Sequence, residues 1–392
     1  MRFFAGSIIG SISCCQGKGT GTYTVGDKQK TVSINNEYHW DRMDDKYDSK
    51  STTLNKIAVQ YLMADAGAAA SMTYEMKGSS AYVIDAATAI ADNFQYDSLS
   101  LHYLNRMYYS DSEWMEIVYR ELSQSHPILY GGSDESYGGH AFVFSGVDAD
   151  GKVYVNWGWD GTGNGYYDFT DLTPVDGLKK MGYTFGSHQE MIVGHRTPSS
   201  ESPYGFTSQW VCDEPYSLRT KDINQVELGL LSLWNLHILS FDGVIELFFE
   251  NQSGGSDDFL IFYDSADSGI VLPQYGFSSS DEESIKIPIN LEDLAAGNYK
   301  VYFRTKDKRD SDYQKVHCIG GDFFVELTKN NDGTIATSSD AIPEPSPVEI
   351  VHKESISNTD RYFDLQGREL NGSTKGLLIR RQGDEVKKVM NR

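Results

Sequence analysis

The sequence predicts a domain of mixed α and β structure, followed by an all-β domain and a short β module at the C-terminus. Apolar residues recur at helical spacing up to about residue 126 and then at strand spacing up to about residue 195. Helices followed by antiparallel strands indicate an α+β domain. A Ser- and Pro-rich segment at 197–203 has the composition of a linker, and beyond it the helical signal nearly vanishes.

Two helices are expected early in the first domain. Ile57, Tyr61 and Leu62 recur at helical spacing and predict the first of them. Gly67 is expected to end this helix, because glycine adopts the left-handed conformation without steric cost. A second apolar stripe over residues 83–94 predicts a helix that packs into the core.

A third helix is expected to begin at Ser110. Glu113 stands three residues further on, and this pair is the sequence signature of a capping box. The helix is expected to bury four apolar residues, which are Trp114, Ile117, Val118 and Leu122. Pro127 ends it, since proline cannot continue a helix.

The remainder of the first domain has strand periodicity. The expected strands form an antiparallel sheet and cover residues 128–130, 141–144, 153–155 and a segment near 191–193. Asp150-Gly151 is expected to form a tight hairpin turn.

Short strands separated by turn residues predict a β-sandwich after the linker. These strands are expected at residues 244–249, 259–263, 285–289 and 299–303. Cys212 and Cys318 lie near the two ends of this domain. They form a disulfide if the end strands are neighbours, and otherwise they are two free buried thiols; the sequence leaves both alternatives open.

Composition excludes several classes of function. A net charge of −22 excludes a nucleic-acid-binding protein, because phosphate binding needs a concentrated positive surface. No apolar run is long enough to span a membrane. The chain has no Cys-x-x-Cys pair and no histidine spacing suited to zinc, so we expect no metal and no cofactor. A serine hydrolase with a Gly-x-Ser-x-Gly elbow is also excluded.

One stretch carries residues suited to nucleophilic catalysis. His140 follows two glycines on one expected strand, and Asn156 precedes Trp157 on the next. An imidazole can take a proton from a thiol and return it to a leaving amine, while a side-chain amide can hold the ring in place. Glycine before the histidine lets a substrate backbone approach closely.

This stretch resembles the streptopain family of bacterial cysteine peptidases. The resemblance rests on the spacing from His140 to Asn156, with Tyr-Gly-Gly at 130–132 and Asn-Gly-Tyr-Tyr at 164–167, and it covers about residues 1–195. It implies a papain-like fold that is truncated at its N-terminus. It further implies that His140 is the catalytic base, that Asn156 is its orienting partner, and that the ring of Trp157 shields their hydrogen bond. Gly139, Ser79, Ser80 and Trp159 are the expected substrate-binding residues.

The nucleophile is the missing part of this assignment. In the family the cysteine lies on a helix shortly before a Met-basic-aromatic sequence, which Met1-Arg2-Phe3-Phe4 resembles. The resemblance therefore implies that the cysteine precedes residue 1 and that the chain as written is inactive. Cys14 and Cys15 are local substitutes, but the glycine-rich sequence after them disfavours the helix that activates a thiolate.

Two functions remain open at this point. The first is a secreted cysteine endopeptidase acting on proteins or peptides. The second is a non-catalytic remnant of a protease, in which the β-sandwich acts as a surface binding or adhesion module.

The expected domains are a peptidase domain at 1–197, a β-sandwich at 204–328, a linker at 329–350 and a C-terminal module at 351–392. The sandwich resembles immunoglobulin-like modules of secreted bacterial enzymes. The last segment carries Asp-Leu-Gln-Gly-Arg at 364–368 and Lys-Gly at 375–376, and it resembles the sorting domain of Bacteroidetes-type bacteria. This resemblance implies a secreted or cell-surface bacterial protein that reaches its location through secretion machinery.

Overall fold

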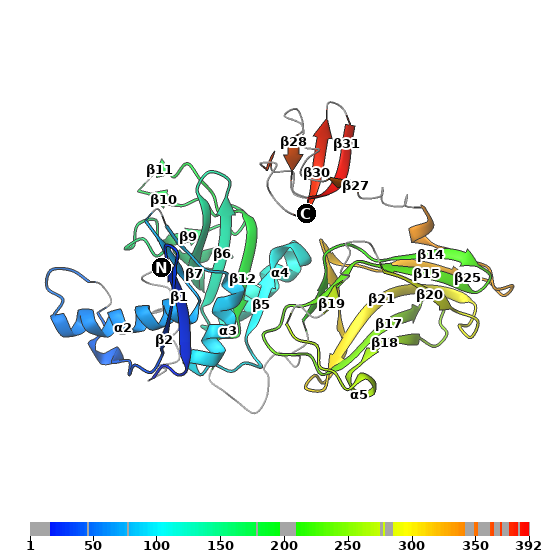
Figure 1. Cartoon of the computed structure of the whole chain (residues 1–392), viewed down its shortest axis with the longest axis horizontal. Coiled ribbons are helices and arrows are strands. Elements are labelled where there is room, and N and C mark those ends of the chain that lie inside the picture. Colours follow the sequence, from blue (N-terminus) through cyan, green and yellow to red (C-terminus); the bar gives the residue numbers. More distant parts are fainter. Residues whose placement is uncertain are drawn as a thin grey trace. The chain divides into compact units, whose positions relative to one another are not determined.

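The computed structural model describes residues 16–44, 47–76, 78–177, 179–196, 209–274 and 285–341 with their side chains. It also describes the backbone of 277–278, 349–351, 361–363, 369–370, 376–382 and 385–391. The chain divides into two compact units, Met1–Thr337 and Ser338–Arg392, and each is described by itself (Figure 1). Cys14, Cys15 and the expected linker at 197–203 lie outside the described residues.

The predicted mixture of α and β structure is confirmed. The described residues before 197 form three α-helices, namely α2 (Thr53–Ala69), α3 (Val83–Phe94) and α4 (Asp111–Ser123). Two short 3-10 helices accompany them, η1 (Trp40–Arg42) and η2 (Arg106–Tyr108). Among the described helices, none combines the length and the apolarity needed to cross a membrane.

The capping box predicted for α4 is present. The Ser110 backbone N–H donates to Glu113 Oε2 over 2.8 Å, and the Ser110 hydroxyl accepts from the Glu113 backbone. Trp114, Val118 and Leu122 are buried as predicted, and Ile117 is partly buried against the same core. Helix α3 also covers the predicted residues, so the apolar spacing was sufficient to locate both elements.

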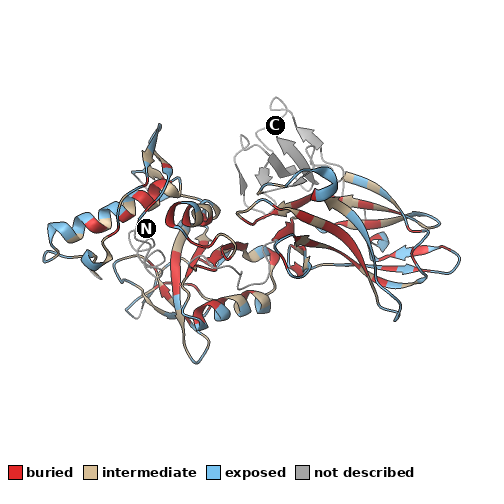
Figure 2. Ribbon diagram, turned by 90° about the horizontal axis from the view of Figure 1, so that it is seen from below, coloured by how far each residue is buried: buried red, intermediate tan, exposed pale blue. Residues whose placement is uncertain are grey.

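Helix α2 differs from the sequence prediction in its end and in its buried face. It continues past Gly67 to Ala69, and Ser71 takes the positive φ of +53°. Gly67 is required for another reason, because a Cβ there would lie 2.0 Å from the Tyr74 hydroxyl. Ile57 and Tyr61 are exposed, and the buried side of the helix consists of Ala58, Leu62, Asp65, Gly67 and Ala68. Figure 2 shows the exposed residues along much of α2.

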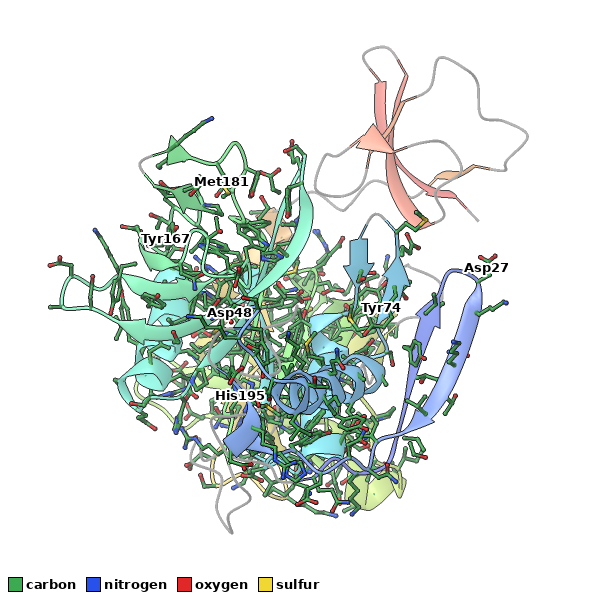
Figure 3. All side chains as sticks on the ribbon, turned by 90° about the vertical axis from the view of Figure 1, so that its left-hand side faces the viewer. Asp27, Asp48, Tyr74, Tyr167, Met181 and His195 are labelled. Atoms are coloured by element: carbon green, nitrogen blue, oxygen red, sulfur yellow. The ribbon has the colours of Figure 1, made fainter. Side chains whose placement is uncertain are left out.

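The first part of the chain contains a four-stranded sheet of order β2-β1-β3-β4. Its strands are β1 (Thr20–Val25), β2 (Lys28–Ser33), β3 (Thr73–Glu75) and β4 (Gly78–Ser80). Asp27 marks the tip of the hairpin between β1 and β2 (Figure 3). Helix α2 packs against β1.

A six-stranded antiparallel sheet of order β5-β12-β6-β7-β8-β9 carries the predicted His140 and Asn156. Its strands are β5 (His102–Asn105), β6 (Ile128–Asp134), β7 (Gly138–Val147), β8 (Val153–Asn156), β9 (Gly165–Tyr167) and β12 (Ser187–Val193). The small strands β10 (Val175–Asp176) and β11 (Lys179–Lys180) pair beside it. Helix α4 packs on β6 and β7, where the Trp114 indole N–H donates to the Tyr130 hydroxyl over 3.0 Å.

A second core belongs to the residues after 209. All four predicted segments are strands here, namely β17 (Gly243–Asn251), β18 (Asp258–Asp264), β20 (Ile285–Asn290) and β21 (Gly297–Asp307). The others are β13 (Trp210–Cys212), β14 (Ser217–Asp222), β15 (Gln225–Leu230), β16 (Ser232–Asn235), β19 (Phe277–Ser278), β22 (Gln314–Lys315), β23 (His317–Cys318), β24 (Gly321–Asp322), β25 (Val325–Lys329) and β26 (Ile335–Thr337). One helical turn, α5 (Ser265–Ser268), interrupts them. The immunoglobulin-like topology stays a prediction.

Cys212 and Cys318 are direct neighbours. They are paired in register between the parallel strands β13 and β23. Both thiols are free and fully buried in the second core. The two strands therefore lie side by side, as a disulfide bond would require. In the structure the two cysteines are nevertheless free thiols.

The two cores are joined by polar contacts. The Tyr108 hydroxyl donates to Asp213, and the Gln209 side chain donates to the Tyr103 carbonyl. Asp213 also accepts from the Trp234 indole N–H. These bonds anchor the region after 209 to the 3-10 turn η2 and strand β5.

The segment expected to be a linker begins with ordered structure. Strand β26 pairs with β25, and Ile335 and Thr337 are buried, so these residues continue the second core. The 3-10 helix η3 (Ser338–Ala341) begins the second unit. That unit forms a sheet of order β27-β31-β30-β28-β29, with strands Glu349–Val351, Glu385–Asn391, Gly376–Gln382, Arg361–Phe363 and Glu369–Leu370 in that order. The motif at 364–368 and residue 375 lie outside the described residues.

Buried histidines make the stability of this fold depend on pH. His195 is 1% exposed, packs edge-on against Tyr96, and is labelled in Figure 3. Burial lowers its pKa from 6.5 to about 3, because a charged imidazole loses its hydration there. Burial also lowers the pKa of His237.

We predict that Leu62→Ala costs about 2–5 kcal/mol of unfolding free energy, because it leaves a cavity under α2. Leu54→Ala on the same helix removes the same atoms from a residue that is 61% exposed, and it should cost less than about 0.5 kcal/mol. Urea unfolding of both variants measures the difference. Equal losses would show that α2 does not bury Leu62.

We also predict that the protein loses stability as the pH falls from 6.5 toward 3. The unfolded chain takes up a proton at His195 in this range and the folded chain does not, so stability is complete above pH 6.5 and declines below it. One such histidine contributes a slope of about 1.4 kcal/mol per pH unit. In urea unfolding at a series of pH values, His195→Leu should flatten the slope, whereas the same change at exposed His188 should not. An unchanged slope in His195→Leu would contradict the assignment.

Candidate active site

His140 lies on β7 beside the hairpin that joins β6 and β7. It is paired with Gly132, and Gly139 is paired with Ser133. The hairpin is held by Asp134, whose carboxylate accepts from the backbone N–H groups of Ser136 and Tyr137 over 2.8 and 2.9 Å. The Ser136 hydroxyl also donates to this carboxylate over 2.6 Å, and this bond, followed by the backbone bonds, lowers the pKa of Asp134.

A backbone carbonyl holds the imidazole of His140. Its Nε2 lies 2.8 Å from the Trp157 carbonyl oxygen. A carbonyl can only accept a hydrogen bond, so Nε2 carries the proton and Nδ1 is the nitrogen with the basic lone pair. Burial lowers the pKa of His140, which favours the neutral ring at neutral pH. The ring is thus oriented and in the form that can accept a proton.

Asn156 holds the turn that carries this carbonyl. It is paired with Val143 rather than with His140. Its side-chain oxygen accepts from the Gly158 N–H over 3.0 Å and from the Asn164 amide over 3.3 Å. The Asn164 oxygen in turn accepts from the Trp157 N–H over 3.0 Å. The described hydrogen bonds of Asn156 therefore orient the Trp157 carbonyl, and the direct bond to His140 that the resemblance implies is not among them.

The ring that covers His140 is Trp159, whereas the resemblance implies Trp157. The Trp159 ring stacks on the imidazole with centroids 4.7 Å apart and planes at 20°. Trp157 is fully buried, stacks beneath Trp159 at 5.6 Å, and contacts Phe142 at 4.6 Å. Gly158 between them has a φ of +74°, so the chain bends here and the two rings lie one on the other.

Three aromatic residues that the sequence did not single out complete the surroundings of His140. Phe185 lies 5.2 Å from the imidazole and Tyr137 lies 6.5 Å from it. Tyr183 stacks on Tyr137 at 4.4 Å. The sequence Tyr-Thr-Phe at 183–185 has two aromatic residues separated by one residue. This alternation was the sequence feature that could have indicated two rings on the same face.

The other expected substrate-binding residues are separate from this group. Ser79 and Ser80 are exposed on β4, in the four-stranded sheet, and no described contact joins them to His140. Gly139 is exposed, and a Cβ there would meet no atom within 4 Å. The glycine thus leaves open space beside the histidine, as the approach of a substrate backbone requires. Their roles stay predictions.

The described residues bring no thiol to His140. Cys212 and Cys318 both belong to the second core, where burial and their mutual contact raise the pKa of Cys212. A buried thiol with a raised pKa is a poor nucleophile.

We predict that Trp159→Ala raises the pKa of His140 toward its ordinary value, because water then reaches the face that the indole covers. NMR titration of the imidazole C–H signals measures this in the 392-residue chain. Tyr166→Ala, at an exposed tyrosine on the neighbouring strand β9, is the matched control and should leave the titration unchanged. A pKa that stays the same, or falls, in Trp159→Ala would contradict the geometry.

Comparison with known proteins identifies relatives of the first part of the chain. The Peptidase C10 family matches residues 13–167. Streptopain from Streptococcus pyogenes is 33% identical over 159 residues, which cover 40% of this chain and 39% of streptopain. The thiol protease/hemagglutinin PrtT from Porphyromonas gingivalis is 30% identical over 187 residues, which cover 47% of this chain and 21% of PrtT. The chain thus spans well under half the length of these two relatives.

Among solved structures, the active wild-type interpain A cysteine protease of Prevotella intermedia is 34% identical. The match covers 46% of this chain and 75% of interpain A, with a TM-score of 0.42. The matched part of the sequence includes both His140 and Asn156. Residues 13–167 of the chain thus match the Peptidase C10 family and are similar to streptopain-like cysteine peptidases.

Proposed function

We propose that this chain is a secreted bacterial cysteine endopeptidase of the streptopain type, with His140 as its general base and acid. The observation that carries the proposal is the hydrogen bond from His140 Nε2 to the Trp157 carbonyl, under the stacked ring of Trp159. This bond leaves Nδ1 to exchange the proton.

The proton transfers follow from this arrangement. Nδ1 takes the proton of a cysteine thiol, and the thiolate attacks the peptide carbonyl. The imidazolium then returns the proton to the leaving amine, which leaves an acyl-enzyme. In the second half, Nδ1 takes a proton from water while the oxygen attacks the thioester carbonyl, and the proton returns to the thiol sulfur.

Trp157 and Asn156 support the charged intermediate. The Trp157 carbonyl accepts from Nε2–H in both forms of the ring, and this bond strengthens when the ring is positive. Asn156 acts indirectly, because its amide oxygen bonds to the turn that orients this carbonyl toward the imidazole. We therefore assign Asn156 as a positioning residue and Trp159 as the ring that keeps water from one face of the imidazole.

The thiol is the part that the described residues do not supply. The position of this thiol is a prediction from the sequence resemblance. The assignment of protein or peptide substrates follows from the family, while subsite preference is not determined by any contact described above. Secretion through the C-terminal module rests on the sequence motif at 364–368.

We predict that the 392-residue chain alone neither cleaves casein nor reacts with an epoxide inhibitor of thiol proteases. The same protein extended by its upstream coding sequence should do both, if that sequence supplies the cysteine. In the extended protein, His140→Ala should lower kcat/KM by at least about a hundredfold.

The matched control is His188→Ala, because His188 is an exposed histidine that contacts Ser133 and not His140. It should retain activity within a few fold. Activity that survives His140→Ala would contradict the proposed base. Epoxide labelling of Cys14 or Cys15 that requires His140 would instead place the nucleophile inside the chain.

A further inference from the structure

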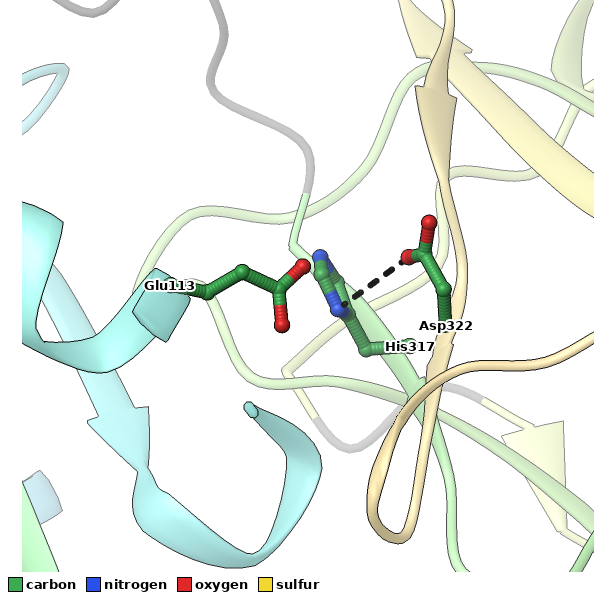
Figure 4. A group of neighbouring side chains, drawn as sticks. All are labelled: Glu113, His317 and Asp322. Atoms are coloured by element: carbon green, nitrogen blue, oxygen red, sulfur yellow. Dashed lines mark ion pairs between the residues drawn. The ribbon is translucent and has the colours of Figure 1, made fainter. Parts of the chain in front are cut away.

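A cluster of potential metal ligands lies where helix α4 meets the second core. Glu113 comes from the first turn of α4, His317 from β23 and Asp322 from β24. One side-chain oxygen or nitrogen of each lies within 4.8 Å of the others. Figure 4 shows the imidazole of His317 between the two carboxylates. The cluster shares no residue with the site around His140.

The backbone fixes the positions of all three side chains. His317 and Asp322 are paired opposite each other in the β23–β24 hairpin, so both project to the same face. The turn of this hairpin is Ile319-Gly320, and Gly320 and the first strand residue Gly321 have φ values of +90° and +111°. Gly320 N–H donates to the Met107 carbonyl over 2.7 Å, which docks the hairpin on η2 just before α4.

The capping box sets the orientation of Glu113. Its Oε2 accepts from the Ser110 N–H and hydroxyl over 2.8 and 2.5 Å, and these bonds leave Oε1 available as a ligand.

His317 presents one nitrogen to the carboxylates. Its Nδ1 is buried, makes no hydrogen bond to any described residue, and lies 3.8 Å from Asp322 Oδ1. A hydrogen bond to the backbone at Tyr108 holds the ring, and Tyr109 packs against it at 4.8 Å. A histidine ligand is commonly oriented in this way, with one nitrogen bonded to the backbone and the other facing the metal.

We propose that Glu113, His317 and Asp322 form a binding site for a divalent transition-metal ion, of which zinc is the best match. One imidazole nitrogen with two carboxylate oxygens suits zinc better than calcium or magnesium, which take oxygen ligands. The ion would join the peptidase domain to the following β domain at one point.

The ligand atoms, which lie within 4.8 Å of one another, must move closer together to bind an ion. Zinc bonds of about 2.1 Å in a tetrahedron separate the ligand atoms by about 3.4 Å. The pair His317 Nδ1 and Asp322 Oδ1, at 3.8 Å, is already near this value. Lys315 contacts the other oxygen of Asp322 at 3.5 Å, so it leaves the ligating oxygen in place while it offsets part of the negative charge.

An adjoining cavity gives the ion access. It has a volume of about 260 Å³ and is lined by Glu113, His317 and Lys315 among other residues. Water in this cavity supplies the fourth ligand that three protein groups leave open.

Zinc titration of the full 392-residue chain, after removal of metals with EDTA, tests this proposal. We expect one equivalent to bind by calorimetry, a rise in Tm on zinc addition, and a visible Co²⁺ spectrum of tetrahedral type. His317→Ala and Asp322→Asn should each weaken binding at least tenfold and abolish the rise in Tm. Asp322 is exposed, so Asp322→Asn should keep the fold even if His317→Ala does not.

Glu113→Gln separates the metal role from the capping role. Its amide oxygen can still accept from Ser110, so α4 keeps its cap while the ligand charge is lost. This variant should also bind at least tenfold more weakly. The matched controls are His188→Ala and Asp176→Asn, an exposed histidine and an exposed aspartate outside the cluster, and both should bind as the wild type does. Absence of zinc binding in the wild type overturns the proposal, as does equal binding by Asp322→Asn and Asp176→Asn.

Discussion

The hydrogen bond between the His140 ring and the Trp157 carbonyl is the contact on which the candidate active site depends. It decides which nitrogen of the imidazole carries a proton and therefore which nitrogen can exchange one. The pairing of β7 with β8 brings the two residues together, and the turn held by Asn156 and Asn164 points the carbonyl at the ring. The stacked indoles of Trp157 and Trp159 then keep the imidazole partly out of water. The site is therefore a product of the strand pairing as much as of the catalytic residue types.

Glu113 connects the two parts of unit 1 through a single helix terminus. Its carboxylate closes the capping box of α4 and also faces His317 from the second core. The hairpin after His317 packs against the same terminus, and a side chain at Gly321 is disfavoured by its φ of +111°. A local helix signal thus has a second role in the tertiary structure. No sequence pattern indicates this role, since Glu113 and His317 lie far apart along the chain.

Short sequence patterns predicted a helix or strand correctly where residues within that one segment determine its structure. The capping box at Ser110 and the apolar stripe at 83–94 located α4 and α3, and the period-two runs located the strands of both cores. For α2 they located the helix but not its end or its buried face, because that face consists mainly of small residues rather than of the large apolar residues that mark a stripe. Gly67 was misread for the same reason, since its requirement comes from the Tyr74 hydroxyl on another strand.

The sequence by itself determined the resemblance of the first part of the chain to a family, the choice of His140 and Asn156 as candidate site residues, and the order of helices and strands. These properties depend on residue types at short separations, where spacing and side-chain chemistry are read directly. The tertiary structure decided that the Trp159 ring and not the Trp157 ring stacks on the imidazole, that Asn156 bonds to the turn after Trp157, and that Cys212 lies beside Cys318. It also decided that Glu113, His317 and Asp322 meet. Each of these depends on register and on packing between segments distant in the chain, and such contacts leave no periodic trace in the sequence.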